Sequence, residues 1–342
     1  MTRLLGRIRE RAFAWRRRRQ PRGVILLYHR VAAPELDPQL LCVSPEHFEE
    51  HLEVLEGYRP ITLSEMARAA GNGGDLRRRA SLTFDDGYVD NGTTARPLLE
   101  AHGIPATVFV ATGYSVSGRE FWWDELERLL LLPDRLPAEL TVEVGDERRS
   151  WILGSSGGPG AGHADWSVAS PRTPSPRHAV YRDLHRLLKP LDAETRRAVL
   201  DRVALKVEDP GVPRLTHRPM TPGELADLAT SAHVSLGAHT VTHAQLSALP
   251  ADEQAREIES SRRQLEAMCG RPIDTFSYPY GARSDFDETS VESVRHAGFG
   301  CACANSPRGV ERGADPFRLP RFLVRDWDRA EFAGRLASMF EG

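Results

Sequence analysis

Two adjacent carboxylates follow an apolar run and stand directly before a glycine, where residues 83–88 read TFDDGY. A turn of this kind can hold one aspartate, Asp86, on a cation and leave its neighbour, Asp85, free to take a proton from a reacting water. Paired aspartates before a glycine are also common as plain turns with a helix cap. The motif therefore suggests a catalytic site only in combination with other residues.

Two histidines four residues apart, His239 and His243, supply such a combination. Their spacing predicts that both imidazoles lie on the same side of a helical turn, which suits a divalent cation. The alternative is a pair of partly exposed histidines at a helix start. Together with Asp86 they form a set of one carboxylate and two imidazoles, which leaves coordination positions free for water and substrate, as in catalytic metal sites.

A third motif lies about 40 residues further on, where residues 276–281 read FSYPYG. Pro279 fixes one backbone torsion and Gly281 frees another, so the backbone N–H of Tyr280 can be aimed rigidly into a pocket. A plain turn at the end of a strand would have the same sequence. The distance from His243 corresponds to one strand–helix unit.

Short apolar runs without strict alternation indicate strands buried on both faces of a parallel sheet. Helical segments lie between several of these runs, two of them ending at Gly103 and Gly270, so we expect an α/β barrel or open sheet. The three motifs follow such runs, and the carboxyl ends of parallel strands share one edge. The runs are 23–29, 81–86, 106–111, 234–239, 274–279, 299–304 and 317–324.

The alternation of strands and helices breaks between about residues 132 and 222. We interpret this stretch as a mostly helical insertion, with helices over 181–188 and 193–205 and a Gly-, Pro- and Ser-rich loop over 151–178. The expected organisation is a single catalytic domain over 23–328. It is preceded by a basic arm over 1–22 and followed by a C-terminal helix over 329–342.

Composition excludes several classes of protein. The 342 residues are 40% hydrophobic and 27% charged, and 45 basic against 48 acidic residues give a net charge of −3, which does not favour nucleic acid as a partner. Four scattered cysteines do not form a disulfide framework. No apolar run after the arm could serve as a signal-peptide core, and none approaches the roughly 20 residues of a spanning helix.

The arm over 1–22 contains nine arginines and one glutamate among apolar residues at near-helical spacing. It could therefore make peripheral contact with an anionic membrane, and the alternative is a solvated basic tail. We expect a cytoplasmic protein, either free or at the inner membrane surface.

Taken together and in this order, the three motifs resemble the first three motifs of the NodB-type polysaccharide deacetylases, carbohydrate esterase family four. The similarity covers roughly residues 23–125 and 217–328. It implies a distorted (β/α)7 barrel and a divalent metal, most often Zn²⁺. It also implies a hydrolase that removes the acetyl group from N-acetylated amino sugars of a glycan or glycoconjugate.

The resemblance also implies roles for individual residues. Asp86, His239 and His243 would bind the metal, Asp85 would be the general base, and the Tyr280 amide would stabilise the oxyanion. Thr240 would brace the metal-binding loop. Substrate-pocket or supporting positions are Tyr88, Thr240, Tyr278, Pro279, Arg321, Arg325 and Trp327.

Two departures from the family pattern concern the base and the acid. The third motif usually has an arginine where Ser277 stands, and either Arg321 or Arg325 could replace it from another strand. The usual C-terminal Leu-x-His motif is absent. His29, after the first strand, resembles the histidine of relatives that act on poly-N-acetylglucosamine, and a near-neutral donor is what expulsion of an amine requires.

Other assignments remain open. His29 could instead be a core-edge histidine bonded to backbone, and the tryptophans Trp122 and Trp123 could pack between barrel and insertion or line the acetyl pocket. The same metal site could act on an O-acetyl ester or a non-sugar amide, or the protein could bind glycans without turnover. We expect the remaining histidines to be structural or exposed: His47, His51, His102, His163, His178, His185, His217, His233 and His296.

Overall fold

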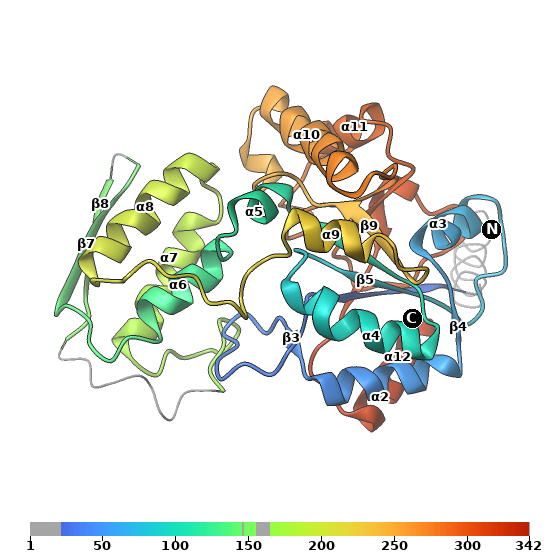
Figure 1. The fold of residues 1–342 in the computed structure, drawn as a ribbon, viewed down its shortest axis with the longest axis horizontal. Helices are drawn as coiled ribbons and strands as arrows, with labels where there is room; N and C mark the ends of the chain where they lie inside the picture. Colours follow the sequence, from blue (N-terminus) through green and yellow to red (C-terminus); the bar gives the residue numbers. More distant parts are fainter. Residues whose placement is uncertain (1–21, 146, 155–164, 342) are drawn as a thin grey trace, which may run out of the picture.

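The computed structural model describes residues 22–145, 147–154 and 165–341, and its centre is a nearly closed barrel of parallel strands (Figure 1). All pairings between neighbours in the barrel are parallel. β4 (Arg59–Pro60) pairs with β5 outside this order. Around the barrel the strands are β12 (Leu319–Pro320), β11 (Cys301–Ala304), β10 (Thr275–Ser277), β9 (Val234–Ala238), β6 (Ala106–Val110), β5 (Arg79–Phe84), β1 (Val24–Tyr28) and β13 (Phe322–Leu323).

A single residue, Arg321, separates β12 from β13. β12 pairs with β11 on one side and β13 pairs with β1 on the other, so one chain segment closes the sheet. Because β12 and β13 belong to one segment, the eight strands occupy seven positions around the barrel, which confirms the distorted (β/α)7 barrel. The strands are short because apolar side chains must fill both the barrel interior and the outer helix interfaces, and β1, β6 and β11 are buried throughout.

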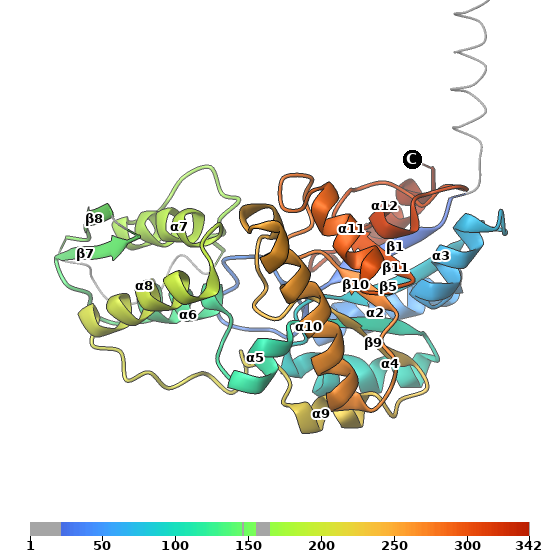
Figure 2. The ribbon, with the colours of Figure 1, turned by 90° about the horizontal axis from the view of Figure 1, so that it is seen from above.

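Helices cover the outside of the barrel (Figure 2). Their starts follow local capping rules: the Ser44 side chain accepts from the His47 N–H, and Thr62 and Thr221 form capping boxes with Glu65 and Glu224. The helices are α2 (Pro45–Glu56), α3 (Leu63–Gly71), α4 (Arg96–His102), α5 (Thr112–Ser117), α9 (Pro222–Leu228), α10 (Ala251–Cys269), α11 (Glu288–His296) and α12 (Arg329–Glu341).

The insertion forms a lobe beside the barrel (Figure 1). The lobe consists of α6 (Trp122–Leu130), which precedes the expected insertion, and of β7 (Glu139–Val144), β8 (Glu147–Ile152), α7 (Pro176–Leu188) and α8 (Ala193–Lys206). Aromatic and aliphatic side chains from α6, α7 and α8 give it a core of its own, which includes Trp122, Tyr181 and Leu200.

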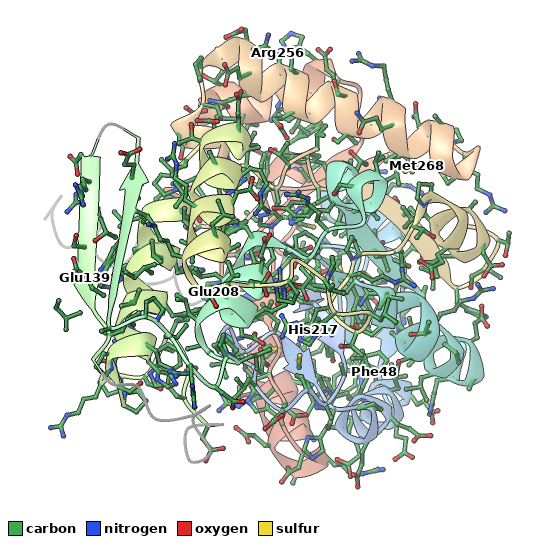
Figure 3. The ribbon with its side chains drawn as sticks, turned by 60° about the vertical axis from the view of Figure 1, so that its left-hand side comes forward. Phe48, Glu139, Glu208, His217, Arg256 and Met268 are labelled. Atoms are coloured by element: carbon green, nitrogen blue, oxygen red, sulfur yellow. The ribbon has the colours of Figure 1, made fainter. Side chains whose placement is uncertain are left out.

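The lobe differs from the sequence expectation in one respect. β7 and β8 pair as an antiparallel hairpin, so Trp151 lies in a strand and not in a loop. The hairpin has one buried and one exposed face, with Leu140 and Val142 packed against the helices. Figure 3 shows the hairpin, with Glu139 labelled, at the outer edge of the molecule. α7 begins at Pro176 and so extends into the expected loop, while residues 155–164 lie outside the described residues.

Residues 1–21, and with them most of the basic arm, lie outside the described residues. Arg22 forms an ion pair with Glu311 at 3.1 Å and donates to the carbonyl of Glu341, next to the end of α12. No helix in the described part of the chain is long and apolar enough to cross a membrane.

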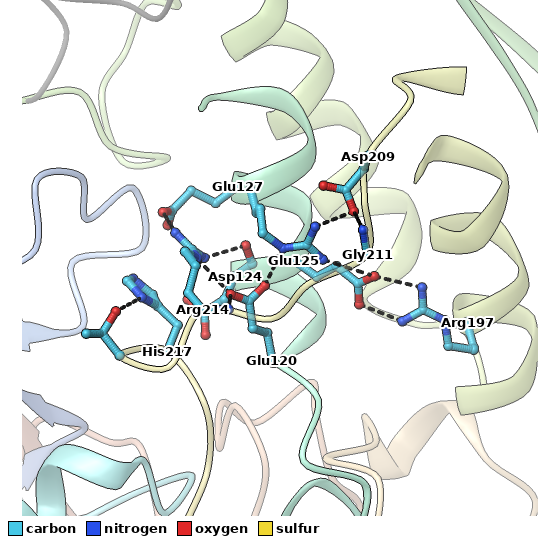
Figure 4. A network of polar contacts seen from close by, with 11 residues as sticks. Glu120, Asp124, Glu125, Glu127, Arg197, Asp209, Gly211, Arg214 and His217 are labelled. Atoms are coloured by element: carbon cyan, nitrogen blue, oxygen red, sulfur yellow. Dashed lines mark hydrogen bonds and ion pairs between the residues drawn. The ribbon is translucent and has the colours of Figure 1, made fainter. Parts of the chain in front are cut away.

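Ion pairs hold the lobe to the segment that returns from α8 to the barrel (Figure 4). Arg214 in this segment donates from Nε to Glu120 at 2.7 Å and from an Nη to Glu127 at 2.6 Å. Both carboxylates are buried at α6. Asp124 and Glu127 also bring ligand atoms within 4.8 Å of His217, but Tyr88 donates to Asp124 and Arg214 to Glu127, so protein donors already occupy this group.

Replacing Arg214 should destabilise the protein without touching the barrel core. In Arg214→Gln, Glu120 and Glu127 would lose a buried cation, and we expect the free energy of unfolding to fall by about 3 kcal/mol. Urea denaturation measures this change. The exposed Arg263 on α10 offers a matched control, because Arg263→Gln should change the same quantity by less than about 1 kcal/mol. Equal effects of the two substitutions would contradict the prediction.

His51 should make the barrel sensitive to acid. Its ring stacks on Phe332 at 3.9 Å, and its Nε2–H donates to the Trp327 carbonyl at 2.7 Å. Burial lowers the pKa of His51 to about 4, against an ordinary 6.5. The unfolded chain therefore binds more protons than the folded one between these values, and stability falls as pH falls from about 6.5 to about 4.

We expect the titration of His51 to lower the free energy of unfolding by on the order of 2 kcal/mol as the pH falls from 7 to 4.5. The measurement is the difference in this pH dependence between the wild type and His51→Gln, whose side chain does not titrate. The loss should be smaller in the variant, and parallel curves would refute the assignment.

Candidate active site

The two aspartates lie where β5 ends. The Asp85 N–H donates to the Tyr28 carbonyl at 3.0 Å, which continues the pairing with β1 and fixes the start of the turn. Asp86 then adopts a φ of +77° and Gly87 one of +81°. A left-handed aspartate is strained, and such residues cluster at functional sites. The turn leaves both carboxyl groups buried and on the same edge of the barrel as the other motifs.

His239 and His243 converge on Asp86 from the end of β9. His239 Nε2 lies 3.6 Å and His243 Nε2 lies 3.2 Å from Asp86 Oδ1. The ligand atoms of the three residues lie within 4.8 Å of one another. His239 Nδ1 is 2.7 Å from the Ser277 carbonyl, and donation to this acceptor directs the free lone pair of Nε2 toward Asp86.

The segment that carries the histidines is not helical, contrary to the sequence expectation. β9 ends at Ala238, and Thr240 and His243 both have left-handed backbones, with φ of +62° and +53°. Glu257 on α10 holds this loop, because its carboxylate accepts from Val241 N at 2.8 Å, Thr242 N at 2.9 Å and Thr242 Oγ1 at 2.9 Å.

The brace of the loop is thus Glu257, which the sequence analysis missed because it lies on a separate helix. Thr240, the residue expected to do this, contributes through its backbone carbonyl, which accepts from Thr112 N at 3.2 Å. Its Oγ1 is buried and has no hydrogen-bond partner.

The electrostatics of Asp86, His239 and His243 fit a divalent cation. Asp86 Oδ1 is buried and has no hydrogen-bond partner, and burial raises the pKa of Asp86 to about 6. Burial lowers the pKa of His239 to about 4 and that of His243 to about 3, so both imidazoles are neutral near pH 7. A cation would compensate the buried carboxylate, and one oxygen with two nitrogens is a donor set typical of zinc.

Arg321, the residue between β12 and β13 where the barrel closes, binds Asp85. Its two terminal nitrogens donate to Asp85 Oδ1 and Oδ2, each at 2.7 Å. It also donates to Ser277 Oγ and to Asn305 Oδ1, each at 2.8 Å. Burial acts to raise the pKa of Asp85, but the Arg321 guanidinium, together with His239 and His29, holds that pKa well below its usual value. Arg321 therefore supplies, from another strand, the guanidinium beside Asp85 that the family pattern would place at position 277.

Tyr280 lies in a tight three-residue turn. Gly281 N–H donates to the Pro279 carbonyl at 2.7 Å, and Tyr280 has a φ of +62°. The Tyr280 carbonyl accepts from Asn305 Nδ2 at 2.6 Å. A Cβ on Gly281 would lie 2.8 Å from the Asn305 side chain, so only glycine fits. The Pro279 carbonyl lies in the same peptide plane as the Tyr280 N–H, so its hydrogen bond fixes that plane, while the Asn305 contact fixes the next plane.

A pocket of about 330 Å³ opens over these residues. His29 lies in its wall, with a buried Nδ1 that has no hydrogen-bond partner. Burial lowers the pKa of His29, while the Asp86 and Asp85 carboxylates act in the opposite direction. The lining also includes Gln39, Leu41, Asp85, Asp86, Trp123, His185, Lys189, His239, His243, Tyr280, Ala282, Asp285, Asn305, Leu323 and Arg325.

The insertion supplies part of this lining, which the sequence analysis did not predict. His185 and Lys189 reach the pocket from α7, although His185 was expected to be structural or exposed. Lys189 pairs with Asp285 at 2.7 Å and lies 4.4 Å from the centre of the Tyr280 ring. Only the folding of the lobe brings these residues to the barrel, and no local pattern in the sequence could have shown it.

Several residues expected at the pocket or in support of it lie outside its lining. Tyr88 is fully buried and donates to Asp124 at 2.6 Å, and Tyr278 donates to the Phe317 carbonyl at 3.0 Å. Trp327 packs against the barrel helices with Arg335 over its ring, so Trp123 is the tryptophan that lines the pocket. Pro279 is absent from the lining but shapes the Tyr280 turn.

Arg325 lines the pocket without contacting Asp85. It donates to the Leu40 carbonyl instead. Of the two arginines that could have oriented the base, Arg321 is therefore the one that the structure brings to it.

The chain resembles known proteins in sequence. The sequence model of the family described as "Polysaccharide deacetylase" matches residues 73–131 and 181–302, just over half of the chain. The chain is 33% identical over 101 residues to the Bacillus subtilis (strain 168) protein named "Putative polysaccharide deacetylase YxkH". This match covers 28% of the chain and about a third, 35%, of that relative.

Solved structures share the fold. The Streptococcus pyogenes deacetylase PplD in complex with acetate has a TM-score of 0.58 at 16% identity, covering 94% of this chain and 100% of that chain. IcaB from Ammonifex degensii has a TM-score of 0.56 at 18% identity, covering 94% and 98%. At these identities the likeness establishes the arrangement of strands and helices.

Proposed function

Since the chain belongs to the polysaccharide deacetylase family, whose members are hydrolases of acetylated sugars, we propose that it removes the acetyl group from the nitrogen of amino sugars with the help of a divalent metal. The observation that carries this proposal is the convergence of Asp86, His239 and His243, with the ion-paired Asp85 beside them in one pocket. Amide hydrolysis needs this combination of a metal site and a base.

Asp86, His239 and His243 would hold the metal, and zinc suits this donor set best. When bound, such an ion would polarise the acetyl carbonyl and lower the pKa of an adjacent water. The neutral state of both imidazoles keeps their lone pairs available as ligands.

Asp85 would take the proton from the attacking water. Arg321 holds the pKa of Asp85 low, so the carboxylate is in its proton-accepting form throughout the neutral range. The bidentate contact also fixes the direction of the carboxylate, while Oδ2 keeps a position 3.9 Å from His239 Nε2, beside the ligand set.

The Tyr280 N–H would donate to the oxygen on which negative charge develops, because its peptide plane is fixed before the substrate binds. His29 would bring a proton to the departing nitrogen. Burial lowers the pKa of His29, so once protonated it releases the proton readily to the leaving amine. The products are acetate and a free amino sugar.

The test is acetate release by the zinc-reconstituted protein across N-acetylglucosamine oligomers, acetylxylan and a small N-acetyl amide. Acetate from the oligomers alone supports the proposal. Acetate from acetylxylan alone would assign an O-acetyl esterase, and acetate only from the small amide would assign a non-sugar amidase. A metal-free protein that binds the oligomers without releasing acetate would instead be a glycan-binding protein.

A further inference from the structure

Arg325 brings to the pocket a positive charge that forms no ion pair with the residues that the structure describes. It follows β13 in the wall that also contains His29 and Leu323. Within the described part of the chain, no carboxylate lies within ion-pair distance of its guanidinium, and its only hydrogen bond there is the donation to the Leu40 carbonyl. A guanidinium has five N–H donors, so most of its donor capacity is unused.

Nearby acids are engaged elsewhere. The two oxygens of Asp37 accept from Leu41 N at 2.9 Å and Cys42 N at 2.8 Å. The Asp326 carboxylate accepts from Ser44 N at 2.8 Å and from Ser44 Oγ at 2.9 Å, and it pairs with His47 at 2.7 Å. Asp37 attracts Arg325 through space, but neither acid forms an ion pair with it, so the guanidinium keeps most of its donors for a group that enters the pocket.

The other charges of the pocket are balanced. Lys189 pairs with Asp285, Arg321 pairs with Asp85, and Asp86 belongs to the candidate metal ligands. His239 and His243 belong to the same candidate ligand set as Asp86. Among the lysines and arginines of the described lining, Arg325 is therefore the one without an ion pair.

The loop opposite Arg325 also presents polar groups. Leu40 has a φ of +55°, which directs its carbonyl to the guanidinium, and the neighbouring Gln39 donates to the Tyr181 hydroxyl on α7 at 2.7 Å. Arg325 is thus held at one of its nitrogens between the loop and the barrel edge. A guanidinium fixed in this way can present its remaining donors to two oxygens of one group.

We propose that Arg325 binds an oxyanion carried by the acetylated sugar, so that the preferred substrate is an anionic glycoconjugate such as a sugar phosphate or an acidic sugar. This inference rests on the proposed function, because it names the substrate class of the same pocket. The group that Arg325 binds is separate from the acetyl group, which lies at the metal ligands and Asp85.

The experiment compares N-acetylglucosamine, N-acetylglucosamine 1-phosphate and N-acetylmuramic acid, which are neutral, phosphorylated and carboxylated. For the zinc-loaded wild type we expect kcat/KM to be at least tenfold higher for one of the anionic sugars than for the neutral one. The anionic sugar with the higher kcat/KM identifies either phosphate or carboxylate as the group that Arg325 binds. The preference should weaken as salt is raised from about 50 mM to 500 mM.

Three variants distinguish the effect of the Arg325 charge from a structural role of its side chain. Arg325→Gln should reduce the selectivity ratio tenfold or more, whereas Arg325→Lys should retain it within about threefold. Arg256, exposed on α10 at the edge of Figure 3, gives the matched control, and Arg256→Gln should leave the ratio unchanged. Equal use of the three sugars by the wild type, or an unchanged ratio in Arg325→Gln, would overturn the inference.

Binding provides a readout that does not depend on turnover. Calorimetric titration of the three sugars should show a Kd for the preferred anionic sugar that is at least tenfold weaker in Arg325→Gln. If none of the sugars releases acetate but this difference in Kd is observed, the oxyanion site stands and the proposed deacetylase function fails. If acetate is released without any dependence on Arg325, the proposed function stands and the oxyanion site fails.

Discussion

Asp85→Asn should retain the metal and lose turnover by about 10² to 10⁴-fold, the usual contribution of a positioned base. Asparagine keeps the size of the side chain and can still accept from Arg321 through its amide oxygen, but it cannot take a proton from water. The measurement is kcat for acetate release, together with metal content by elemental analysis. A variant that turns over at nearly the wild-type rate would contradict the role of Asp85.

The matched control is Asp86→Asn, one residue further along the same turn. It removes the negative charge from the candidate ligand set, so metal content should fall together with activity. Loss of metal in Asp85→Asn, with metal retained in Asp86→Asn, would exchange the roles of the two aspartates.

Arg321→Met should lower the free energy of unfolding by about 3–5 kcal/mol, because it leaves the Asp85 carboxylate buried without its cation. Arg321 is itself fully buried and makes five hydrogen bonds to Asp85, Thr83, Ser277 and Asn305. Urea denaturation in the presence of a chelator measures the change independently of metal binding.

A double-mutant cycle with Asp85→Asn isolates the pair. The double variant should be more stable than the sum of the two single effects predicts, since removing both charges leaves no unpaired ion in the interior. Strict additivity would show that Arg321 acts mainly through Ser277 and Asn305. In that case a group other than Arg321 would have to lower the pKa of Asp85.

The sequence led to those parts of the site that have local signatures. Asp85 and Asp86 follow a buried strand, and the two histidines follow another, so the shared strand edge predicts their meeting. The helical turn expected for the histidines was wrong because Glu257, on a separate helix, fixes the loop in left-handed conformations. Local spacing contains no information about such a tertiary brace.

The remaining residues of the site depend on contacts between distant segments. Asn305 orders both Arg321 and Tyr280, and Lys189 meets Asp285 across 96 residues of sequence. The β7–β8 hairpin escaped prediction because its exposed strand, β8, is polar along most of its length. Which of Arg321 and Arg325 contacts Asp85 also depends on the three-dimensional fold, since both follow apolar residues near the same strand end.

The seam between β12 and β13 has a consequence for biosynthesis. The guanidinium that contacts Asp85 comes from residue 321, 236 residues further along the chain. A nascent chain therefore cannot close its barrel or pair Asp85 with this guanidinium until residue 321 has left the ribosome. The segment that closes the barrel also completes the candidate active site, so we expect both to form late in synthesis.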